Sequence, residues 1–493
     1  MLRSVICALL LGTLLLGRAS AQNATPLAIL DTNVVDVIEG ASHSHQSIVV
    51  AAGRIAAVGP ADSVTVPPDA TRIPGQGLYV IPGLWDMHVH LRSAHSKPQV
   101  ALIEENAALL DLFLPNGVVG VREMGGDLAD YVLQWREEIR SGKRTGPRIL
   151  TALRKIDEEP PEWPGSLGVK TPAEAREAVR QVKQAGADFV KVYFRRTPPE
   201  VLGAVVDEAH KLNLRVTGHW PSNIPIQEVT DIGQDGIEHS IYLPVYRRPE
   251  FEQLEKELAA RKGTVWAAER TEVVARHLYM QDEKGAAEVY RAMAAKPVWV
   301  TPTLTAETRI RREIGVRDFT QDPRQAFVFP AVWQSWDPKF GGRKPIPEGH
   351  PRELADIFLK HYHQAALAAY KAGVPMLAGT DCGVDNSYLF PGWSLHEELE
   401  SLVALGITPA DAVRMATINA ARWRGQADSE GSIAKGKVAD LVLLRSDPLE
   451  AIRHTREIEA VVQCGRYYSR TDLDAMLNKA ALRAAAARHE ARR

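Results

Sequence analysis

The chain has little cysteine, almost no net charge and only one long apolar run. Its three cysteines, Cys7, Cys382 and Cys464, are too few and too far apart for a disulfide framework. The formal net charge is −2, so the sequence lacks the excess of basic residues that would indicate a nucleic-acid partner. Beyond the N-terminus, no stretch is apolar enough to span a bilayer. We therefore expect a globular protein of 493 residues, stabilised by a hydrophobic core.

The first 21 residues have the layout of a secretory signal peptide. A short cationic start precedes the apolar run Val5–Gly17, and the small residues Ala19–Ala21 form a cleavage site. The run is shorter than the roughly 20 residues of a membrane-spanning helix, which argues against a membrane anchor. We predict cleavage after residue 21 and an exported product, periplasmic or secreted, with no membrane span after cleavage.

Both ends of the chain favour β structure. Segments 47–52 and 55–58 flank a Gly-Arg turn, which indicates a hairpin, and segments 439–444 and 458–463 are two further strands. We predict that residues 22–80 and 429–470 together form a small β-sandwich domain. Residues 471–493 are expected to form a helical tail whose basic end, Arg483–Arg493, is solvated and frayed.

The middle of the chain, residues 81–428, alternates short apolar strands with amphipathic helices. Strands are expected at Tyr79–Val89, Gly117–Val121, Arg148–Ala152, Asp188–Phe194, Leu214–His219, Gly236–His239, Val298–Thr303 and Val374–Gly379. Thr171, Thr197 and Thr408 each precede a proline and, three positions later, an acid, which predicts three helix N-caps. Eight such repeats predict an α/β fold, a (β/α)8 TIM barrel.

One segment, about residues 243–370, is too long for a single βα unit. We interpret it as an insertion near the seventh strand. Two roles stay open for it: it could cover the mouth of the barrel, or it could be a surface elaboration with no part in catalysis.

Several side chains with metal-binding chemistry stand at the ends of these strands. His88 and His90 are two residues apart on a strand, so they face the same way and can bind one cation. His219, His239 and Asp381 each end or follow a strand, at the face where barrel active sites form. An aspartate there can hold a metal and accept a proton from its bound water.

Lys191 lies inside the apolar strand at residues 188–194. Burying an ammonium group is costly, and a lysine with a lowered pKa can react with carbon dioxide to give a carbamate. The alternative is that the lysine reaches solvent at the strand end.

The run from Ile81 to His90, Ile-Pro-Gly-Leu-Trp-Asp-Met-His-Val-His, resembles the opening motif of the amidohydrolase superfamily. Gly379-Thr-Asp381 resembles its last motif, and Ala421–Asp447 resembles the return into its β domain. The lysine of Gly-Ala-Asp-Phe-Val-Lys191 is similar to that of the binuclear prolidase-like and carboxypeptidase-like branch. Imidazolonepropionase and the related deaminases have a similar outline but lack this lysine.

The resemblance implies a role for each position. His88 and His90, with Asp381, match the ligands of a first metal, and His219 and His239 match those of a second. Lys191 matches the carbamylated lysine that bridges the two. The implied cofactors are two divalent cations, with zinc favoured by the His and carboxylate ligands and manganese, cobalt or iron also compatible.

The implied chemistry is hydrolysis of an amide or peptide-like C–N bond by metal-activated hydroxide. Asp381 would carry the proton to the leaving nitrogen, and Tyr242 could polarise the carbonyl oxygen. Tyr242 could equally be a loop aromatic that packs on the insertion. A small molecule, a dipeptide or an N-acyl amino acid is the expected substrate, and the sequence allows an oligomer.

Two other functions are compatible with parts of the pattern. A mononuclear deaminase or cyclic-imide hydrolase, as in imidazolonepropionase, predicts one metal per chain and an unmodified Lys191. A catalytically silent binding module predicts a broken ligand set, whereas all six positions are filled here.

Three further residues have a simpler interpretation than catalysis. His396 begins a zincin-like sequence, but Glu400 stands where the second histidine is needed, so we expect an ordinary helix that could line the pocket. Cys382 should turn away from the metals into the core. Arg122 is expected to pair with Glu123 or Asp127 rather than with a substrate carboxylate.

Overall fold

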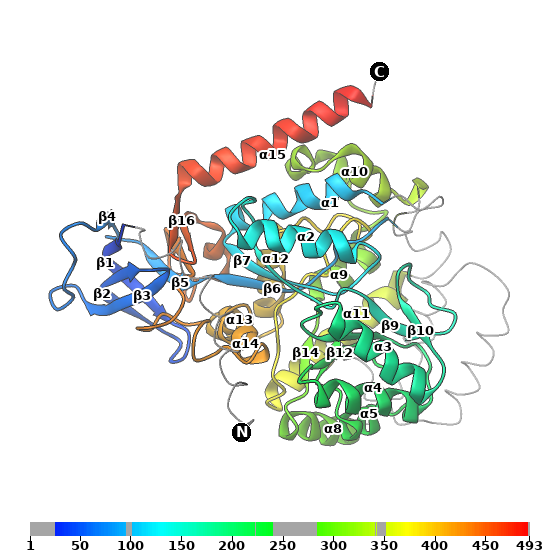
Figure 1. Ribbon diagram of the computed structural model, residues 1–493. Coiled ribbons are helices and arrows are strands. Elements are labelled where there is room, and N and C mark those ends of the chain that lie inside the picture. Colours follow the sequence, from blue (N-terminus) through cyan, green and yellow to red (C-terminus); the bar gives the residue numbers. More distant parts are fainter. Residues whose placement is uncertain are drawn as a thin grey trace, which may run out of the picture.

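The computed structural model describes residues 25–94, 101–221, 223–239, 283–340, 342 and 352–491. A sheet made from both chain ends lies beside a larger α/β part (Figure 1). The predicted signal peptide, residues 1–21, lies outside the described residues. Within the described part, no helix has the length and apolar character needed to cross a bilayer.

The end sheet has eight strands in the order β17-β16-β15-β5-β1-β2-β3, with β4 beside β1. Its strands are β1 Leu27–Asp36, β2 Ala41–Ala51, β3 Arg54–Pro60, β4 Thr71–Pro74, β5 Tyr79–Pro82, β15 Leu441–Leu444, β16 Ile458–Gln463 and β17 Arg466–Ser469. The antiparallel pair β2–β3 confirms the predicted hairpin. The two chain ends join where β5 pairs with β15, with Ile81 opposite Val442. The domain boundaries and the sandwich arrangement stay predictions.

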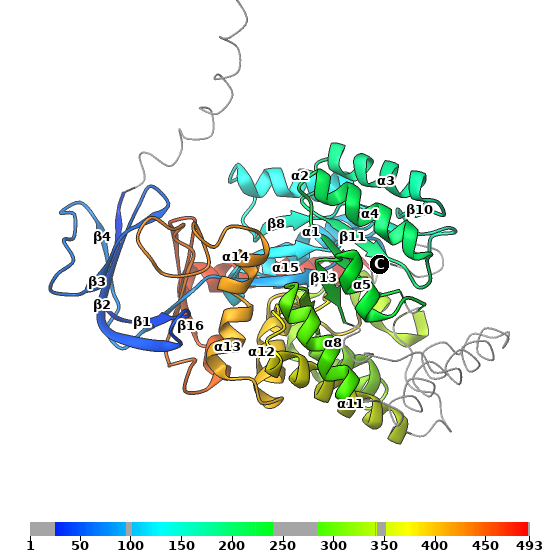
Figure 2. The same cartoon turned by 90° about the horizontal axis from the view of Figure 1, so that it is seen from below.

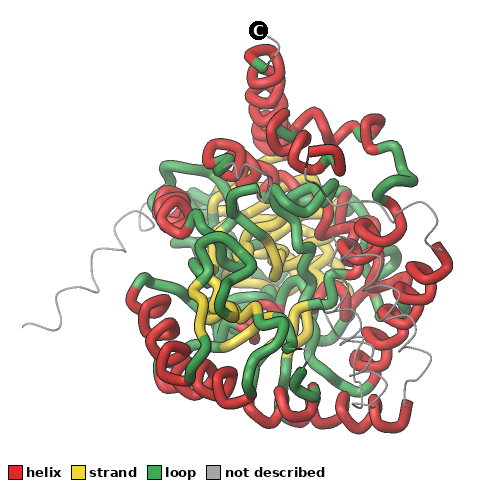
Figure 3. Tube along the Cα trace, turned by 90° about the vertical axis from the view of Figure 1, so that its right-hand side faces the viewer, coloured by secondary structure: helices red, strands yellow, loops and turns green. Residues whose placement is uncertain are grey.

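The middle of the chain has parallel strands surrounded by helices, which confirms an α/β fold (Figures 2 and 3). One sheet has the order β10-β9-β11-β12-β13-β14 and the other β6-β7-β8. These strands are β6 Leu84–Val89, β7 Val118–Glu123, β8 Arg148–Thr151, β9 Lys155–Glu158, β10 Leu167–Val169, β11 Val190–Tyr193, β12 Val216–Gly218, β13 Gly236–Glu238 and β14 Trp299–Thr301.

The expected eighth strand, residues 374–379, links the two parallel sheets without forming a regular strand. Leu377 N donates to Val300 O on β14 at 2.8 Å, and Met87 N on β6 donates to Ala378 O at 2.9 Å. Isolated parallel bridges join Val300 to Met376 and Val89 to Cys382. Among the described strands the two sheets are therefore bridged on one side by this segment, and no closed sheet is formed.

One strand prediction was wrong in detail, and the strands β9 and β10 were not predicted. The single expected strand 79–89 is divided at Gly83, where a Cβ would lie 2.5 Å from Val119, into β5 in the end sheet and β6 in a parallel sheet. The sequence also did not predict β9, which pairs with β11. Ile156 is the one large apolar side chain in this short strand, so it carries almost no hydrophobic signal.

Helices cover the parallel strands. They are α1 Ile103–Leu109, α2 Ala129–Arg140, α3 Pro172–Gln184, α4 Pro199–Lys211, α5 Ile226–Ile232, α8 Glu283–Ala295, α9 Leu304–Thr308, α10 Pro330–Trp336, α11 Arg352–Lys371, α12 Trp393–Ala404, α13 Pro409–Met415, α14 Ile418–Trp423 and α15 Arg470–Glu490. Two of the three predicted N-caps are confirmed, at Thr171 and Thr408. The third was wrong, because Thr197 exchanges backbone hydrogen bonds with Asn223 and α4 begins after Pro198.

The described part of the insertion packs against the segment that follows Asp381. Trp336 at the end of α10 is fully buried, and its Nε1 donates to Gly383 O at 3.1 Å. Ser335 Oγ donates to Val384 O at 2.7 Å. These contacts hold the insertion against a segment that lies only a few residues after Asp381, the predicted proton carrier.

The C-terminal helix α15 lies across α1 and α10 (Figure 1). Arg483 pairs with Asp111 at 2.8 Å, and Arg488 Nη2 donates to Ala326 O at 2.8 Å. Ala484 is fully buried. The expectation of a solvated, frayed end was therefore wrong for these residues, because small alanines on one face let the helix pack closely.

Candidate metal centre

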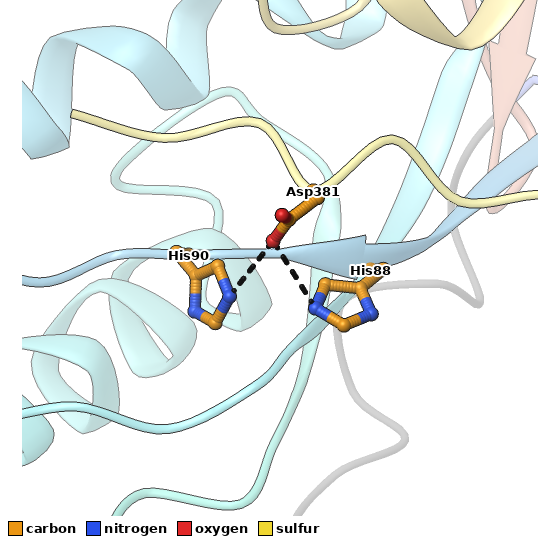
Figure 4. A group of neighbouring side chains, drawn as sticks. All are labelled: His88, His90 and Asp381. Carbon is orange, nitrogen blue, oxygen red and sulfur yellow. Dashed lines mark ion pairs between the residues drawn. The ribbon is translucent and has the colours of Figure 1, made fainter. Parts of the chain in front are cut away.

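Three of the predicted ligands meet in one buried cluster (Figure 4). His88 lies on β6 and His90 just beyond its end, and both rings face the carboxylate of Asp381. Asp381 Oδ1 is 3.3 Å from His88 Nε2 and 3.0 Å from His90 Nε2. Two imidazoles and a carboxylate within 4.8 Å of one another form a group that could hold a metal ion.

The His88 ring is held by Glu238, a residue that the sequence analysis did not single out. His88 Nδ1 is 2.8 Å from Glu238 Oε2, and both side chains are buried. A His88 ring that donates from Nδ1 to Glu238 has its lone pair on Nε2, where it can bind a cation placed between the ring and Asp381.

Glu238 is in turn held by a buried cation. Arg122 Nη2 lies 2.7 Å from Glu238 Oε1, which also accepts a bond from Thr217 Oγ1. Arg122 Nε donates to Met87 O at 2.6 Å, next to His88 in the chain. The expected partner of Arg122, Glu123 or Asp127, was therefore wrong, and the arginine positions the centre through Glu238.

Two site residues adopt left-handed backbone conformations. Asp381 has φ 60° and immediately precedes the bridge residue Cys382, and His239 has φ 63° and follows directly on β13. Asp381 N donates to His88 O at 2.8 Å, and His239 N donates to Thr301 O at 2.9 Å. Such conformations are unfavourable for residues other than glycine and persist where neighbouring structure fixes them, often at functional sites.

The electrostatics leave these side chains in the states that metal ligands need. Burial holds the pKa of His90 well below its ordinary value and lowers that of His239 to about 4, so both rings are neutral near pH 7. Burial alone would raise the pKa of Asp381, but the nearby His239, His88 and His90 hold it well below its usual range. His90 and His239 thus offer neutral imidazoles, and Asp381 offers an ionised carboxylate.

The predicted ligands of a second metal lie next to this cluster. The His239 ring centroid is 4.6 Å from that of His88 and 5.1 Å from that of His219. His239 Nδ1 is 2.7 Å from Thr303 Oγ1, which fixes the ring. The histidines from β6, β12 and β13 therefore form a continuous group of rings.

Lys191 on β11 is buried to 1% exposure, and its Nζ has no hydrogen-bond partner among the described residues. Burial lowers its pKa from 10.5 to about 8, with the charges of Glu238 and Asp381 acting in the opposite direction. The alternative of a lysine that reaches solvent is thereby excluded. A buried amine with a lowered pKa and no partner is chemically suited to carbamylation.

The structure describes two of the three other predicted positions. The third, Tyr242, lies outside the described residues. His396 does not line the site, because its Nδ1 is 2.9 Å from Thr455 Oγ1 and its Nε2 donates to Asn116 O at 3.0 Å. Cys382 is buried in the core, as expected.

Comparison with known proteins agrees with this geometry. The sequence model of the Amidohydrolase family matches residues 79–466. Ochratoxinase of Aspergillus niger is 24% identical over 429 residues, which cover 78% of this chain and 73% of the relative.

Two solved structures share the fold. A Xaa-Pro dipeptidase with methionine bound in its active site superposes with a TM-score of 0.66 at 22% identity, over 90% of this chain and 100% of that chain. The structure of A. niger ochratoxinase gives a TM-score of 0.62 at 19% identity, over 90% of this chain and 96% of the other. This chain belongs to the Amidohydrolase family and is a hydrolase that acts on carbon–nitrogen bonds.

Proposed function

We propose that this protein is a metal-dependent amidohydrolase that cleaves the amide bond of a dipeptide or an N-acyl amino acid. The observation that carries the proposal is the buried cluster of His88, His90 and Asp381, in a site that also contains a lysine whose amine has no partner. The names of the relatives, a dipeptidase and ochratoxinase, support an amide substrate.

The residues present fit a two-metal centre. His88, His90 and Asp381 would hold one cation, and His219 and His239 the other. Lys191 would bridge them once its amine nitrogen bonds to the carbon of carbon dioxide with loss of a proton, which gives a carbamate. The unpartnered Nζ supports this assignment, because a carbamate bound to cations would satisfy a group that is otherwise buried alone. Zinc suits this set of donors.

When bound, divalent cations supply a water of lowered pKa and polarise the carbonyl of the scissile amide. Asp381 is placed to accept the proton of the attacking water and to return it to the leaving nitrogen. Its low pKa keeps it ionised and ready to accept that proton. Glu238 and Arg122 act on the centre by fixing the His88 ring.

Two further features belong to the proposal. The parallel strands would form a closed (β/α)8 barrel, with segment 374–379 as its eighth strand. The hydrogen bonds of this segment to β14 and β6 support this arrangement.

The protein would be exported, to the periplasm or outside the cell, as the signal-like start of the sequence indicates.

A substrate screen tests the proposed function. The mature chain, purified with zinc and bicarbonate, is assayed on a library of dipeptides, including Xaa-Pro dipeptides, and N-acyl amino acids, before and after treatment with a chelator. We expect release of a free amino acid that the chelator abolishes and added zinc restores. Asp381→Asn should lower kcat by about 10²- to 10⁴-fold, the usual effect of losing a general acid–base. The exposed Asp62→Asn is the matched control. Full activity in chelated protein or in Asp381→Asn would contradict the proposal.

A further inference from the structure

The short helix α9 begins beside the metal centre without the cap that its sequence offers. Thr303 is its N-cap residue, and the hydroxyl of an N-cap threonine ordinarily accepts a hydrogen bond from an amide of the first turn. Helix α9 lies wholly within the described residues, and none of its amides donates to the Thr303 side chain. Thr303 Oγ1 is instead 2.7 Å from His239 Nδ1. The capping hydroxyl is therefore used by a predicted metal ligand.

A carboxylate from another helix caps α9 in place of Thr303. Glu398 on α12 accepts a hydrogen bond from Leu304 N at 2.9 Å on Oε1 and one from Thr305 N at 2.8 Å on Oε2. Glu398 and Thr303 are both fully buried. Both carboxylate oxygens thus satisfy first-turn amides that would otherwise be buried without an acceptor, at a cost of about 1–3 kcal/mol each.

The backbone around His239 and Thr303 is fixed by further contacts. Thr303 has φ 49° and ψ 49°, a left-handed conformation that is unfavourable for a β-branched residue and persists only where neighbouring structure holds it. The hydroxyl of Tyr362, a buried residue on α11, lies 3.0 Å from His239 O and also bonds to Pro302 O. With the backbone held, the rotamer of Thr303 decides whether its hydroxyl serves the His239 ring or the helix.

We propose that Glu398 is a positioning residue of the second metal site. By accepting the amides of Leu304 and Thr305, it leaves the hydroxyl of Thr303 to hold the ring of His239. A His239 ring that donates from Nδ1 to Thr303 keeps its lone pair on Nε2 for a cation. The inference rests on the proposed function, since it takes His239 as a ligand of the second cation. Without the Glu398 carboxylate the amides lack their acceptor, and the Thr303 hydroxyl turns to them.

The test measures zinc affinity, site by site, by titrating metal-free protein in competition with a chelating dye. The variants are Thr303→Val, Thr303→Ser, Glu398→Gln and the double variant Thr303→Val with Glu398→Gln. Glu400→Gln is the matched control, because it lies on the same helix and its carboxylate pairs with Arg456 at 2.7 Å. Urea unfolding of the metal-free proteins measures the structural cost of each substitution separately.

Two conditions keep the result interpretable. Burial raises the pKa of Glu398 to about 7, against the effect of the two amides, so the titrations are made at about pH 8.5, where the carboxylate is ionised. Glu398→Asp is the second variant if glutamine is not tolerated, because its shorter side chain cannot reach both amides.

We expect Thr303→Val to weaken one of the two zinc sites by about 10- to 100-fold, the usual effect of losing a partner behind a metal ligand. Thr303→Ser, which keeps the hydroxyl, should bind zinc as the wild type does. Glu398→Gln should weaken the same site by at least about tenfold. The double variant should bind no more weakly than Thr303→Val, because Glu398 acts through that hydroxyl. Glu400→Gln should match the wild type.

Wild-type affinity at both zinc sites in Glu398→Gln overturns the proposal. Additive losses in the double variant also overturn it, since Glu398 would then support the site without Thr303. Failure of the proposed function gives a different result: no amide is cleaved, while one zinc site still depends on Thr303 and Glu398.

Discussion

At the scale of single residues, the centre depends on side chains that fix other side chains. His88 can offer Nε2 to a cation beside Asp381 only while Glu238 accepts the hydrogen bond from its Nδ1. Glu238 remains ionised in a buried position because Arg122 is 2.7 Å away: burial alone would raise its pKa, but Arg122 and His88 hold it well below its usual range. The orientation of the His88 ring therefore depends on two successive buried contacts, from His88 to Glu238 and from Glu238 to Arg122.

Glu238→Gln should weaken metal binding by about 10- to 100-fold, as loss of a partner behind a metal ligand commonly does. The amide cannot hold His88 with the same strength, and Arg122 loses its buried counter-charge. Competition with a chelator measures the affinity, and Glu228→Gln, an exposed acid on α5, is the control. An unchanged affinity in Glu238→Gln would show that the His88 ring needs no such support.

The sequence predicted where the histidines and Asp381 lie, because side chains at the carboxyl ends of parallel strands converge. It could not predict Glu238, since strict alternation puts residues 238 and 239 on opposite faces. The chain leaves the extended conformation at His239, with φ 63°, and both side chains reach the centre. Strand β9 was missed because it has no apolar run and follows a left-handed residue, Leu153.

At the scale of elements, His396 on α12 forms hydrogen bonds to neighbouring segments and does not belong to the metal centre. His396 joins this helix to the turn at Asn116 and to Thr455. Both ring nitrogens are engaged and the side chain is fully buried, which explains why its zincin-like sequence has no metal function.

The burial of His396 predicts a pH-dependent stability. Burial lowers its pKa from 6.5 to about 3, so below pH 6.5 the unfolded chain takes up a proton that the folded protein cannot. Stability from this residue is therefore complete above pH 6.5 and is lost as the pH falls toward 3, by on the order of 5 kcal/mol. Urea unfolding of wild type and His396→Gln at several pH values measures the effect. The wild type should lose more stability on acidification than the variant; equal losses would show that His396 is not neutral in the folded state.

Element boundaries were predicted well where a local signal fixes them. Thr171 and Thr408 cap their helices because the hydroxyl oxygen reaches a backbone amide three residues on. Thr197 has the same local sequence, but its backbone bonds to Asn223, a partner 26 residues away that no local pattern reveals. Tertiary contacts of this kind also divide the strand at Gly83.

At the scale of the whole molecule, the C-terminal helix returns to the α/β part and covers it. Leu473 on α15 is completely buried in the main core, whereas Leu482 on the same helix is 71% exposed. The sequence predicted the helix but not its packing, because its mix of Ala and Arg shows no strong apolar face.

Leu473→Ala should lower the free energy of unfolding by about 2–5 kcal/mol, the usual cost of a cavity at a buried leucine. Leu482→Ala is the matched control and should change it by less than about 0.5 kcal/mol. Urea denaturation of both variants measures the difference. Equal stabilities of the two variants would contradict the packing of α15 described above.

The central claim is a two-metal centre bridged by a modified Lys191, and counting metals tests it most directly. The mature chain, prepared with zinc and bicarbonate, is analysed by elemental mass spectrometry, and its intact mass is measured under non-denaturing conditions. We predict two metals per chain and the added mass of one carbon dioxide. In Lys191→Ala the added mass should disappear and metal occupancy should fall. A single metal in the wild type, with unchanged occupancy in Lys191→Ala, would contradict the account.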